Sequence, residues 1–328
     1  MLNPLVSISC ISYNHASYIR QCLDGMLMQQ TDFPFEIVIH DDASTDGTAE
    51  ILKEYASKYP DRIFPMFQEK NQYGKGVRAL MARFNFPRCR GKYIALCEGD
   101  DFWTDKKKLQ KQFHYLEQHP ECSICFHDMK VVDNNDKIIR EHTNIDQPLE
   151  SSIYDLAEKG NFIWTASVMF RKKDMPYPQW YFDLPIGDYP MHLIHAGFGN
   201  IGFIPEGMGA YRLHDAGTLG LKSRSEVLEK WSVMLEQVKD KFTDKINERL
   251  HHQYLDTIYR AYLEYARQHH AAKAALSIQK LMHLDPYFLF KERERFETKI
   301  ESFQNSRLMA LSRKINRVKK KVGLKTGK

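Results

Sequence analysis

Long hydrophobic runs are missing from this chain of 328 residues. No uninterrupted apolar stretch approaches the roughly 18 residues that a membrane-spanning helix requires. No secretory leader is evident either, because strand-like sequence begins as early as Leu5. With 43% hydrophobic and 27% charged residues, the composition is ordinary for a soluble globular protein. These features predict a cytoplasmic protein.

Metal-binding pairs of cysteines are lacking as well. Cys122 and Cys125 have CxxC spacing, but no second Cys or His pair accompanies them to complete a zinc site. All six cysteines fall in or beside apolar segments: Cys10, Cys22, Cys89, Cys97, Cys122 and Cys125. Free cysteine is among the most often buried residue types, so we expect reduced thiols in the core.

A basic domain is also absent, although the net charge is +5. Residues 301–328 hold nine Lys or Arg and one Glu, a local charge of +8, which leaves −3 for the other 300 residues. The positive charge therefore belongs to a tail, and no nucleic-acid partner is expected.

Two glycine-rich phosphate-binding motifs are missing. No GxGxxG follows the first apolar segment, and no GxxxxGK[ST] occurs anywhere. These absences argue against a dinucleotide-binding Rossmann domain and against P-loop hydrolases. A chain of this kind would bind phosphates through a divalent cation on carboxylates, because Mg²⁺ and Mn²⁺ accept oxygen ligands and let substrate phosphates supply some of them.

Apolar segments alternate with helical patterns over the first 120 residues. The sequence predicts strands over residues 5–11, 35–40, 63–67 and 93–97, with helices between them and another over 108–118. This alternation predicts right-handed crossovers and a mainly parallel sheet. Three of the strands end in polar, acid-rich turns, at residues 12–14, 41–46 and 98–101. Ligands bind at the carboxyl edge of such sheets, so we expect one nucleotide-type site there.

The third of these turns, Glu98-Gly99-Asp100-Asp101, is the centre of the pattern. Its three carboxylates repel one another unless a cation or hydrogen-bond donors neutralise them. The alternative is a solvated turn in which Asp100 or Asp101 caps the following helix. Phe102 and Trp103 are expected to pack at the start of that helix.

An ordered set of motifs resembles glycosyltransferase family 2. The first four are Ser12-Tyr13-Asn14, Asp41–Thr48, Gly91–Ile94 and Glu98–Trp103, and the set continues with Lys108–Gln112, Ser167–Arg171, Gly187–Pro190 and Tyr211–His214. The resemblance spans roughly residues 5–215. It implies an α/β, Rossmann-like GT-A fold, with a mainly parallel sheet and flanking helices. It also implies an inverting, metal-dependent enzyme that uses a nucleotide-diphosphate sugar, with a UDP-sugar as the expected donor.

The resemblance assigns roles to individual residues. The expected nucleotide-binding residues are Ser12, Tyr13, Asn14, Asp42 and Asp100, with Asp42 on the base. The expected ligands of Mn²⁺ or Mg²⁺ are Asp101 first, then Asp100 and His214. Further contacts to the donor or its diphosphate are expected from Glu98, Arg78 and Arg212. Glu98 stands where the family more commonly has Asp, which leaves its role open between ribose, metal and the shape of the turn.

Asp188 is the expected general base, again by resemblance. It would take the proton of the acceptor hydroxyl as that oxygen attacks the anomeric carbon. The alternative is that Asp188 caps a helix over residues 191–196. A catalytically inactive sugar- or nucleotide-binding module on the same fold is the rival function. A glycoside hydrolase would leave the acidic metal motif unexplained.

The last third of the chain has helical periodicity. Ser223 and Glu226 form a capping-box pattern, and helical segments follow near residues 246–268, 271–283 and 287–303. The predicted organisation is a GT-A domain over residues 1–221, an all-α region over 222–304 and a basic tail over 305–328. The helical region could hold the acceptor, mediate a homo-oligomer or cover the core.

The tail has apolar residues at helical spacing, with basic residues on its other faces. The apolar positions are Leu308, Leu311, Ile315, Val318 and Val322. A basic amphipathic helix suits an anionic membrane surface, and a solvated or coiled-coil tail is the alternative. We therefore expect a protein that is cytoplasmic or peripheral on the inner face of the cell membrane. Its expected acceptor is a saccharide or lipid-linked saccharide of a surface polysaccharide.

Overall fold

The computed structural model describes residues 3–173, 176–214, 223–288 and 291. Its contacts divide the chain into two compact units, Met1–Thr257 and Ile258–Lys328. The first unit contains one sheet with the strand order β3-β2-β1-β4-β9-β6-β10-β5, in which β7 also pairs with β6 and β8 with β10.

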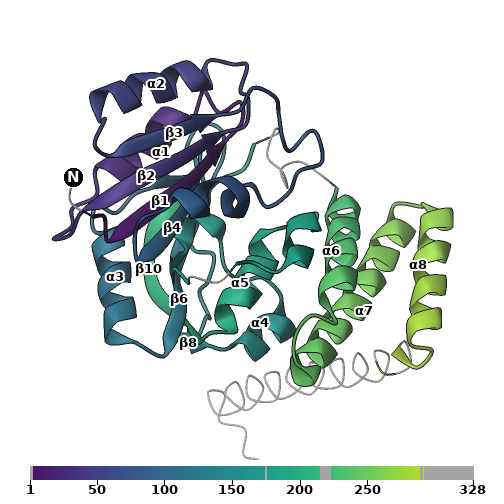
Figure 1. Cartoon of the computed structure of the whole chain (residues 1–328). Helices are drawn as coiled ribbons and strands as arrows, with labels where there is room; N and C mark the ends of the chain where they lie inside the picture. Colours follow the sequence, from purple (N-terminus) through teal and green to yellow (C-terminus); the bar gives the residue numbers. More distant parts are fainter. Residues whose placement is uncertain (1–2, 174–175, 215–222, 289–290, 292–328) are drawn as a thin grey trace, which may run out of the picture. The chain divides into compact units, whose positions relative to one another are not determined.

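The first half of the sheet is parallel, as predicted. Its strands are β1 (Val6–Ser12), β2 (Phe35–Asp41), β3 (Ile63–Phe67) and β4 (Tyr93–Glu98). β1 lies between β2 and β4 and is parallel to both, and β2 is parallel to β3 (Figure 1). β1, β2 and β4 are buried almost throughout, which explains their continuous apolar sequences.

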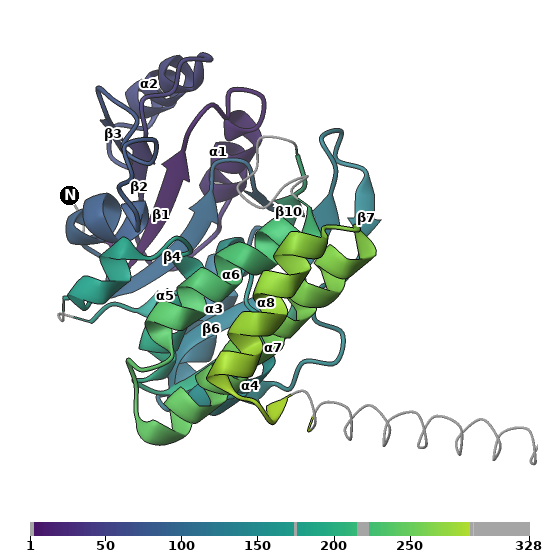
Figure 2. The same ribbon diagram turned by 90° about the vertical axis from the view of Figure 1, so that its right-hand side faces the viewer.

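The second half adds short antiparallel strands, so the sheet is mixed, while the pairings between its long strands are parallel as predicted. β6 (Cys122–Val132) and β10 (Asn200–Arg212) are parallel, but β9 (Met169–Arg171) runs antiparallel between β4 and β6. The other antiparallel strands are β5 (Phe102–Trp103), β7 (Ile138–Arg140) and β8 (Glu150–Ser151). Figure 2 shows the hairpin that joins β6 and β7. Strands of two or three residues are too short to show a sequence period.

Phe102 and Trp103 form the short strand β5, and the Trp103 ring packs, as expected, at the start of the next helix, 3.7 Å from Nζ of its first residue, Lys108. Trp103 pairs with Gly209 of β10, and its indole Nε1 donates to the Ala166 carbonyl at 2.8 Å. Only 2% of Trp103 is exposed, so this ring packs in the core.

Helices flank the sheet. Those of the first unit are α1 (Ile19–Leu27), α2 (Thr48–Lys58), α3 (Lys108–Gln118), α4 (Ile153–Lys159), α5 (Asp188–Ala196) and α6 (Arg224–Val238). A π-helix, Met81–Asn85, and a 3₁₀ turn, Phe86–Arg88, replace the helix predicted after β3. The capping box predicted from Ser223 and Glu226 is present at the start of α6.

The core contains all six cysteines as buried free thiols, as predicted. Cys22 of α1 and Cys97 of β4 lie with their sulfur atoms 3.8 Å apart. Ile19, Leu23 and Met26 of α1 pack in the same core cluster, so this helix buries one apolar face.

The second unit is helical in the part that the structure describes. It contains the end of α7 (Asp244–Arg267) and α8 (Ala271–Leu284), in agreement with the predicted helical region. Tyr259 and Phe288 pack edge to face there, with ring centroids 6.2 Å apart. Most of the predicted helix over 287–303, and the whole tail over 305–328, lie outside the described residues. No described helix is both long enough and apolar enough to span a membrane.

Candidate active site

The sheet brings three strand ends together at one edge. Ser12 of β1 pairs with Asp41 of β2, and Ile11 pairs with Glu98 of β4. The turns that follow these three strands therefore lie side by side, as the sequence analysis expects of parallel strands.

Asp41 organises the first two turns. Its Oδ1 accepts hydrogen bonds from the hydroxyls of Ser12 at 3.0 Å and Ser44 at 2.6 Å. The Ser44 hydroxyl in turn accepts from the Asn14 backbone N–H at 2.9 Å. Asn14 has a φ of 55°, and its side-chain oxygen accepts from the Thr45 N–H at 2.8 Å. The Ser12 and Asn14 side chains thus shape the loops of the expected nucleotide pocket.

Asp42 holds the loop that follows β3. Its two carboxylate oxygens accept from the backbone N–H groups of Gln72, at 2.7 Å, and Tyr73, at 2.9 Å. In the same loop, the Arg78 guanidinium stacks 4.3 Å from the Tyr73 ring centroid and donates to its carbonyl. Asp42, directly after β2, therefore fixes the loop that carries Arg78. Tyr13 lies on the turn after β1 and is 44% exposed.

Asp101 has one buried oxygen without a partner. Its Oδ1 accepts from the Arg212 backbone N–H at 2.9 Å, whereas Oδ2 has no hydrogen-bond partner among the described residues. Burial, together with the charges of Asp100 and Glu98, raises the pKa of Asp101 well above its usual range. A buried carboxylate oxygen that lacks a donor is suited to a divalent cation.

Asp100 lies between two histidines. His214 Nε2 is 2.9 Å from Asp100 Oδ2, and His15 Nε2 is 3.6 Å from the same oxygen. Burial alone would raise the pKa of Asp100, but the hydrogen bond from His214 and the charges of the two histidines hold it below the usual value. A Cβ on Gly99 would lie 2.9 Å from His15 Nδ1 and 3.1 Å from the Ile11 carbonyl oxygen. This position therefore needs glycine.

His15 is a site residue that the sequence analysis missed. It directly follows Ser12-Tyr13-Asn14, and that adjacency was the available signal. Burial is the main reason that its pKa is lowered, so the ring is mostly neutral at neutral pH.

Glu98 connects the acidic turn with Asp188. Burial, followed by the charges of Asp100 and Asp188, raises the pKa of Glu98 to about 8. Tyr211 lies near the same carboxylates. Burial raises the pKa of its hydroxyl most, followed by the negative charges of Asp101, Glu98, Asp100 and Asp188. Tyr211 also packs against Trp164, with ring centroids 4.7 Å apart. Trp180 lies against Phe242 instead, at 6.0 Å.

Arg212 has protein partners on every guanidinium nitrogen. Nε donates to the Asp100 carbonyl at 3.0 Å, and Nη2 donates to Gln21 Oε1 at 2.6 Å. Nη1 donates to the Asp133 carbonyl at 3.1 Å and pairs with Asp136 Oδ1 at 2.7 Å. The guanidinium thus ties the acidic turn to α1 and to the β6–β7 hairpin.

Asp188 is the first residue of α5. The helix is preceded by Gly187, and no side chain caps it, so Asp188 does not cap a helix that starts near residue 191. Its Oδ2 accepts from Asn161 Nδ2 at 3.0 Å. Burial raises the pKa of Asp188, and the nearby backbone amides and Asn161 offset part of that rise. A partly buried carboxylate with a raised pKa is suited to general base catalysis.

The acidic turn does not by itself bring three metal ligands together. Among the described residues, three ligand atoms lie within 4.8 Å of one another only at Glu121, Cys122 and Glu150, near the start of β6. Asp101 therefore fits a cation that takes further oxygen ligands from a substrate.

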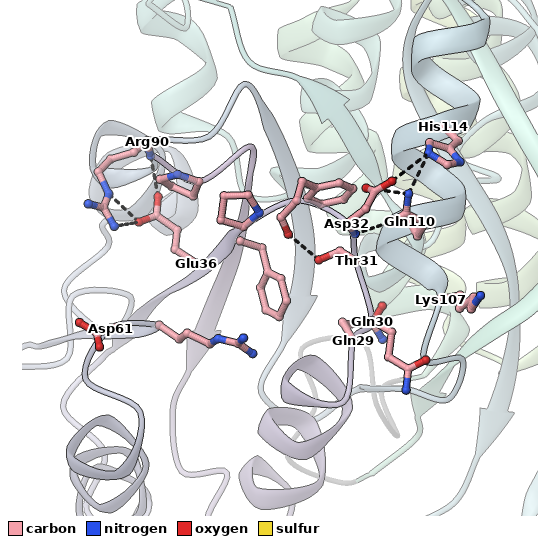
Figure 3. A pocket seen from close by; sticks show the side chains of 15 residues that line it. Gln29, Gln30, Thr31, Asp32, Glu36, Asp61, Arg90, Lys107, Gln110 and His114 are labelled. Atoms are coloured by element: carbon pink, nitrogen blue, oxygen red, sulfur yellow. Dashed lines mark hydrogen bonds and ion pairs between the residues drawn. The ribbon is translucent and has the colours of Figure 1, made fainter. Parts of the chain in front are cut away.

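A pocket of about 1120 Å³ lies at the opposite edge of the sheet, beside the first residues of β1 and β2. Figure 3 shows its polar lining, in which Arg90 pairs with Glu36 and Asp32 lies beside Gln110 and His114. It includes none of the residues expected to bind the donor.

The sequence of this chain matches a known protein family. The model described as "Glycosyl transferase family 2" matches residues 7–176. The uncharacterised protein Rv1520 of Mycobacterium tuberculosis is 41% identical over 216 residues, which are 65% of this chain and 60% of that protein. A Bacillus subtilis protein described as a teichuronic acid biosynthesis glycosyltransferase, TuaG, is 32% identical over 52% of this chain and 63% of its own length. The match thus spans less than two thirds of these relatives.

Solved structures share the fold. S. aureus TarS 1-349 in complex with UDP-GlcNAc has a TM-score of 0.63 at 15% identity, and the match covers 92% of each chain. The mannosyltransferase PcManGT from Pyrobaculum calidifontis, solved with GDP-Man and Mn²⁺, has a TM-score of 0.54 at 15% identity. That match covers 87% of this chain and 85% of the other. Both likenesses concern the fold: a curled mixed sheet with flanking helices.

Proposed function

The chain belongs to glycosyl transferase family 2, and on that premise we propose that it transfers a sugar from a nucleotide-diphosphate donor to an acceptor hydroxyl, with inversion. The observation that carries the proposal is that Glu98 and Tyr211 lie near both the acidic turn and Asp188. A donor's diphosphate and an acceptor's hydroxyl would thus meet between the acidic turn and Asp188.

Asp188 acts as the base in this proposal. Oδ2 accepts from Asn161, whereas Oδ1 has no side-chain donor among the described residues and would accept from the acceptor hydroxyl. Deprotonation of that hydroxyl makes its oxygen a better nucleophile toward the anomeric carbon, a contribution of about 10²- to 10⁴-fold. The raised pKa helps, because a stronger base accepts the proton more readily.

Asp101, with Asp100 and His214 beside it, would hold Mn²⁺ or Mg²⁺. Asp101 Oδ2, which has no hydrogen-bond partner in the part of the chain that the structure describes, fits that role. A divalent cation bound there supplies Lewis-acid stabilisation of the departing diphosphate. A structural neighbour that was solved with GDP-Man and Mn²⁺ supports the choice of metal.

The nucleotide would lie over the first two turns. We assign its contacts to Ser12, Tyr13, Asn14 and Asp42, with Asp100 near the ribose. Arg78 is the better candidate for a diphosphate contact, because the Arg212 guanidinium already has protein partners on each nitrogen. Arg212 then acts by holding the acidic turn. The UDP-sugar bound by the neighbouring TarS structure supports a UDP-sugar donor.

The acceptor is proposed to be a saccharide or lipid-linked saccharide of a surface polysaccharide. The relative described as a teichuronic acid biosynthesis glycosyltransferase supports this choice. Association with an anionic membrane through residues 305–328, and a homo-oligomer through the helical region, complete the proposal.

A panel of UDP-, GDP- and dTDP-sugars tests the function. Thermal shift with Mn²⁺ should select one donor class, and that donor should then be hydrolysed or transferred. Binding without any turnover would favour the inactive binding module. The absence of both would contradict the proposal.

A further inference from the structure

One side chain bonds two residues on the same face of α5. Asn161 Nδ2 donates to Asp188 Oδ2 at 3.0 Å, and Asn161 Oδ1 lies 3.2 Å from His192 Nδ1. Asp188 and His192 are four residues apart, so they lie one above the other on the helix. Asn161 follows α4 and its C-cap, Gly160, and therefore reaches α5 from a separate element.

The direction of the Asn161 amide is set by a third contact. The backbone N–H of Ile163 donates to Asn161 Oδ1 at 3.2 Å. Because a backbone N–H can only donate, the oxygen of the amide must face Ile163. The NH₂ group is then held toward Asp188.

His192 strengthens this orientation. The ring is fully buried, and burial, followed by the charge of His195, lowers its pKa to about 3. The ring is therefore neutral at physiological pH, and facing a carbonyl oxygen it carries its proton on Nδ1. Its Nε2 is buried and has no hydrogen-bond partner in the described part of the chain. His192 is thus a constant donor to Asn161.

We propose that Asn161 is a positioning residue that orients the carboxylate of Asp188 toward the acceptor hydroxyl, with His192 and Ile163 fixing the Asn161 amide. The proposal rests on the assignment of Asp188 as the base. Asn161 is the only side chain that donates a hydrogen bond to Asp188 among the described residues. Without it, the carboxylate at the start of α5 would be held only by the backbone amides of Asp188 and Tyr189.

Other groups face Asp188 and must be considered in a pH test. They are Glu98 at the end of β4, Tyr211 of β10 and Tyr181 of the 3₁₀ turn Gln179–Asp183. None of them donates a hydrogen bond to Asp188 in the described structure, and each is unchanged in a variant at position 161. A change in the pKa of Asp188 on substitution of Asn161 is therefore due to loss of the Asn161 side-chain amide and its hydrogen bond.

The sharpest variant is Asn161→Asp. It has the same shape and keeps an oxygen for Ile163 and His192, but it places a carboxylate opposite Asp188. Asn161→Ala removes the donor without adding a charge. The matched control is Asn200→Asp, because Asn200, at the half-buried start of β10, donates to Glu150 Oε1 at 2.5 Å.

The first readout is the pKa of Asp188, measured by carboxyl-carbon NMR with the signal assigned by its loss in Asp188→Asn. Both Asn161 variants should raise this pKa, by about one unit in Asn161→Asp. The control should leave it unchanged. An unchanged pKa in both Asn161 variants would overturn the proposal. This readout needs no substrate, so it decides the role of Asn161 even if the transferase function fails.

The second readout is kinetic. Asn161→Asp should lower kcat by about 10- to 100-fold, leave the donor KM within about twofold and move the acid limb of the pH–rate profile upward. Loss of kcat with an unmoved acid limb would instead mark a structural role and overturn the proposal. A wild-type protein without turnover on any donor would contradict the proposed function, not the positioning of Asp188.

Discussion

The carboxylates of the site have similar intrinsic acidity, but their surroundings shift their pKa values in different directions. Asp100 is hydrogen-bonded by His214, and this bond, together with the charges that His15 and His214 carry when protonated, holds its pKa below the usual value. Asp101 has a buried oxygen that lacks a donor among the described residues, and burial raises the pKa of Asp188 at the start of α5. In the proposed mechanism, one motif therefore supplies an anion beside the histidines and an oxygen for a cation, and a separate helix would supply the base.

Asp101→Asn tests the cation site. The amide oxygen still accepts from the Arg212 N–H, so the local fold should persist, but the anionic oxygen is lost. We expect the affinity for Mn²⁺, measured by titration calorimetry with a nucleoside diphosphate present, to fall about 10-fold or more. The control is Asp32→Asn, an exposed carboxylate at the opposite edge of the sheet. Equal affinities for wild type and Asp101→Asn would remove Asp101 from the metal site.

At the scale of elements, helices and strands were predicted correctly from sequence where their apolar or capping patterns extended over enough residues. The long apolar runs of β1, β2 and β4 predicted a parallel sheet whose turns share an edge, and the Ser223 capping box predicted the start of α6. The short strands β5 and β9 and the π-helix carry no such period. Asn161 was missed because its contacts reach 27 and 31 residues along the chain, and packing, not a local motif, sets them.

The turn before β4 requires glycine at position 91. A Cβ there would lie 2.6 Å from the Ser7 backbone nitrogen, so β1 and the turn could not keep their spacing. Gly91→Ala should lower the free energy of unfolding in urea by about 1–3 kcal/mol. Gly207→Ala is the control, since a Cβ at that position would have no described atom within 4 Å. A Gly91→Ala protein as stable as the control would show that this turn can relax.

Lys108 is a buried amine on α3. Its Nζ has no hydrogen-bond partner among the described residues and lies 3.7 Å from the Trp103 ring centroid. Burial lowers its pKa to about 7, from 10.5 in the unfolded chain. Between these values the unfolded state binds more protons than the folded state, so this group makes stability rise with pH.

Lys108→Met should therefore stabilise the protein by about 2–4 kcal/mol at pH 7, and the gain should shrink toward pH 9. Urea unfolding at the two pH values measures the difference. Lys107→Met, on the exposed neighbour, should show no such pH dependence. A gain that is the same at pH 7 and pH 9 would mean that the buried amine remains charged.

At the scale of the whole molecule, the charge is divided between a slightly acidic body and a basic end. The +8 of residues 301–328 contrasts with −3 for the rest of the chain. A transferase that acts on a lipid-linked acceptor gains from being held at an anionic surface, where each basic residue adds about 1 kcal/mol.

Deletion of residues 305–328 should reduce cosedimentation with vesicles that contain anionic lipid, and high salt should weaken binding of the intact chain in the same way. Turnover of a water-soluble acceptor should not change. Vesicle binding that survives the deletion would place the membrane contact elsewhere or remove it.

The central claim is that Asp188 is the base of a nucleotide-sugar transferase, and one comparison tests it most directly. Donor affinity and single-turnover rate are measured for wild type and for Asp188→Asn, with Mn²⁺ and the donor selected by the panel. The account predicts an unchanged donor affinity and a transfer rate lower by about 10²- to 10⁴-fold. Transfer at the wild-type rate, or loss of donor binding together with transfer, would contradict it.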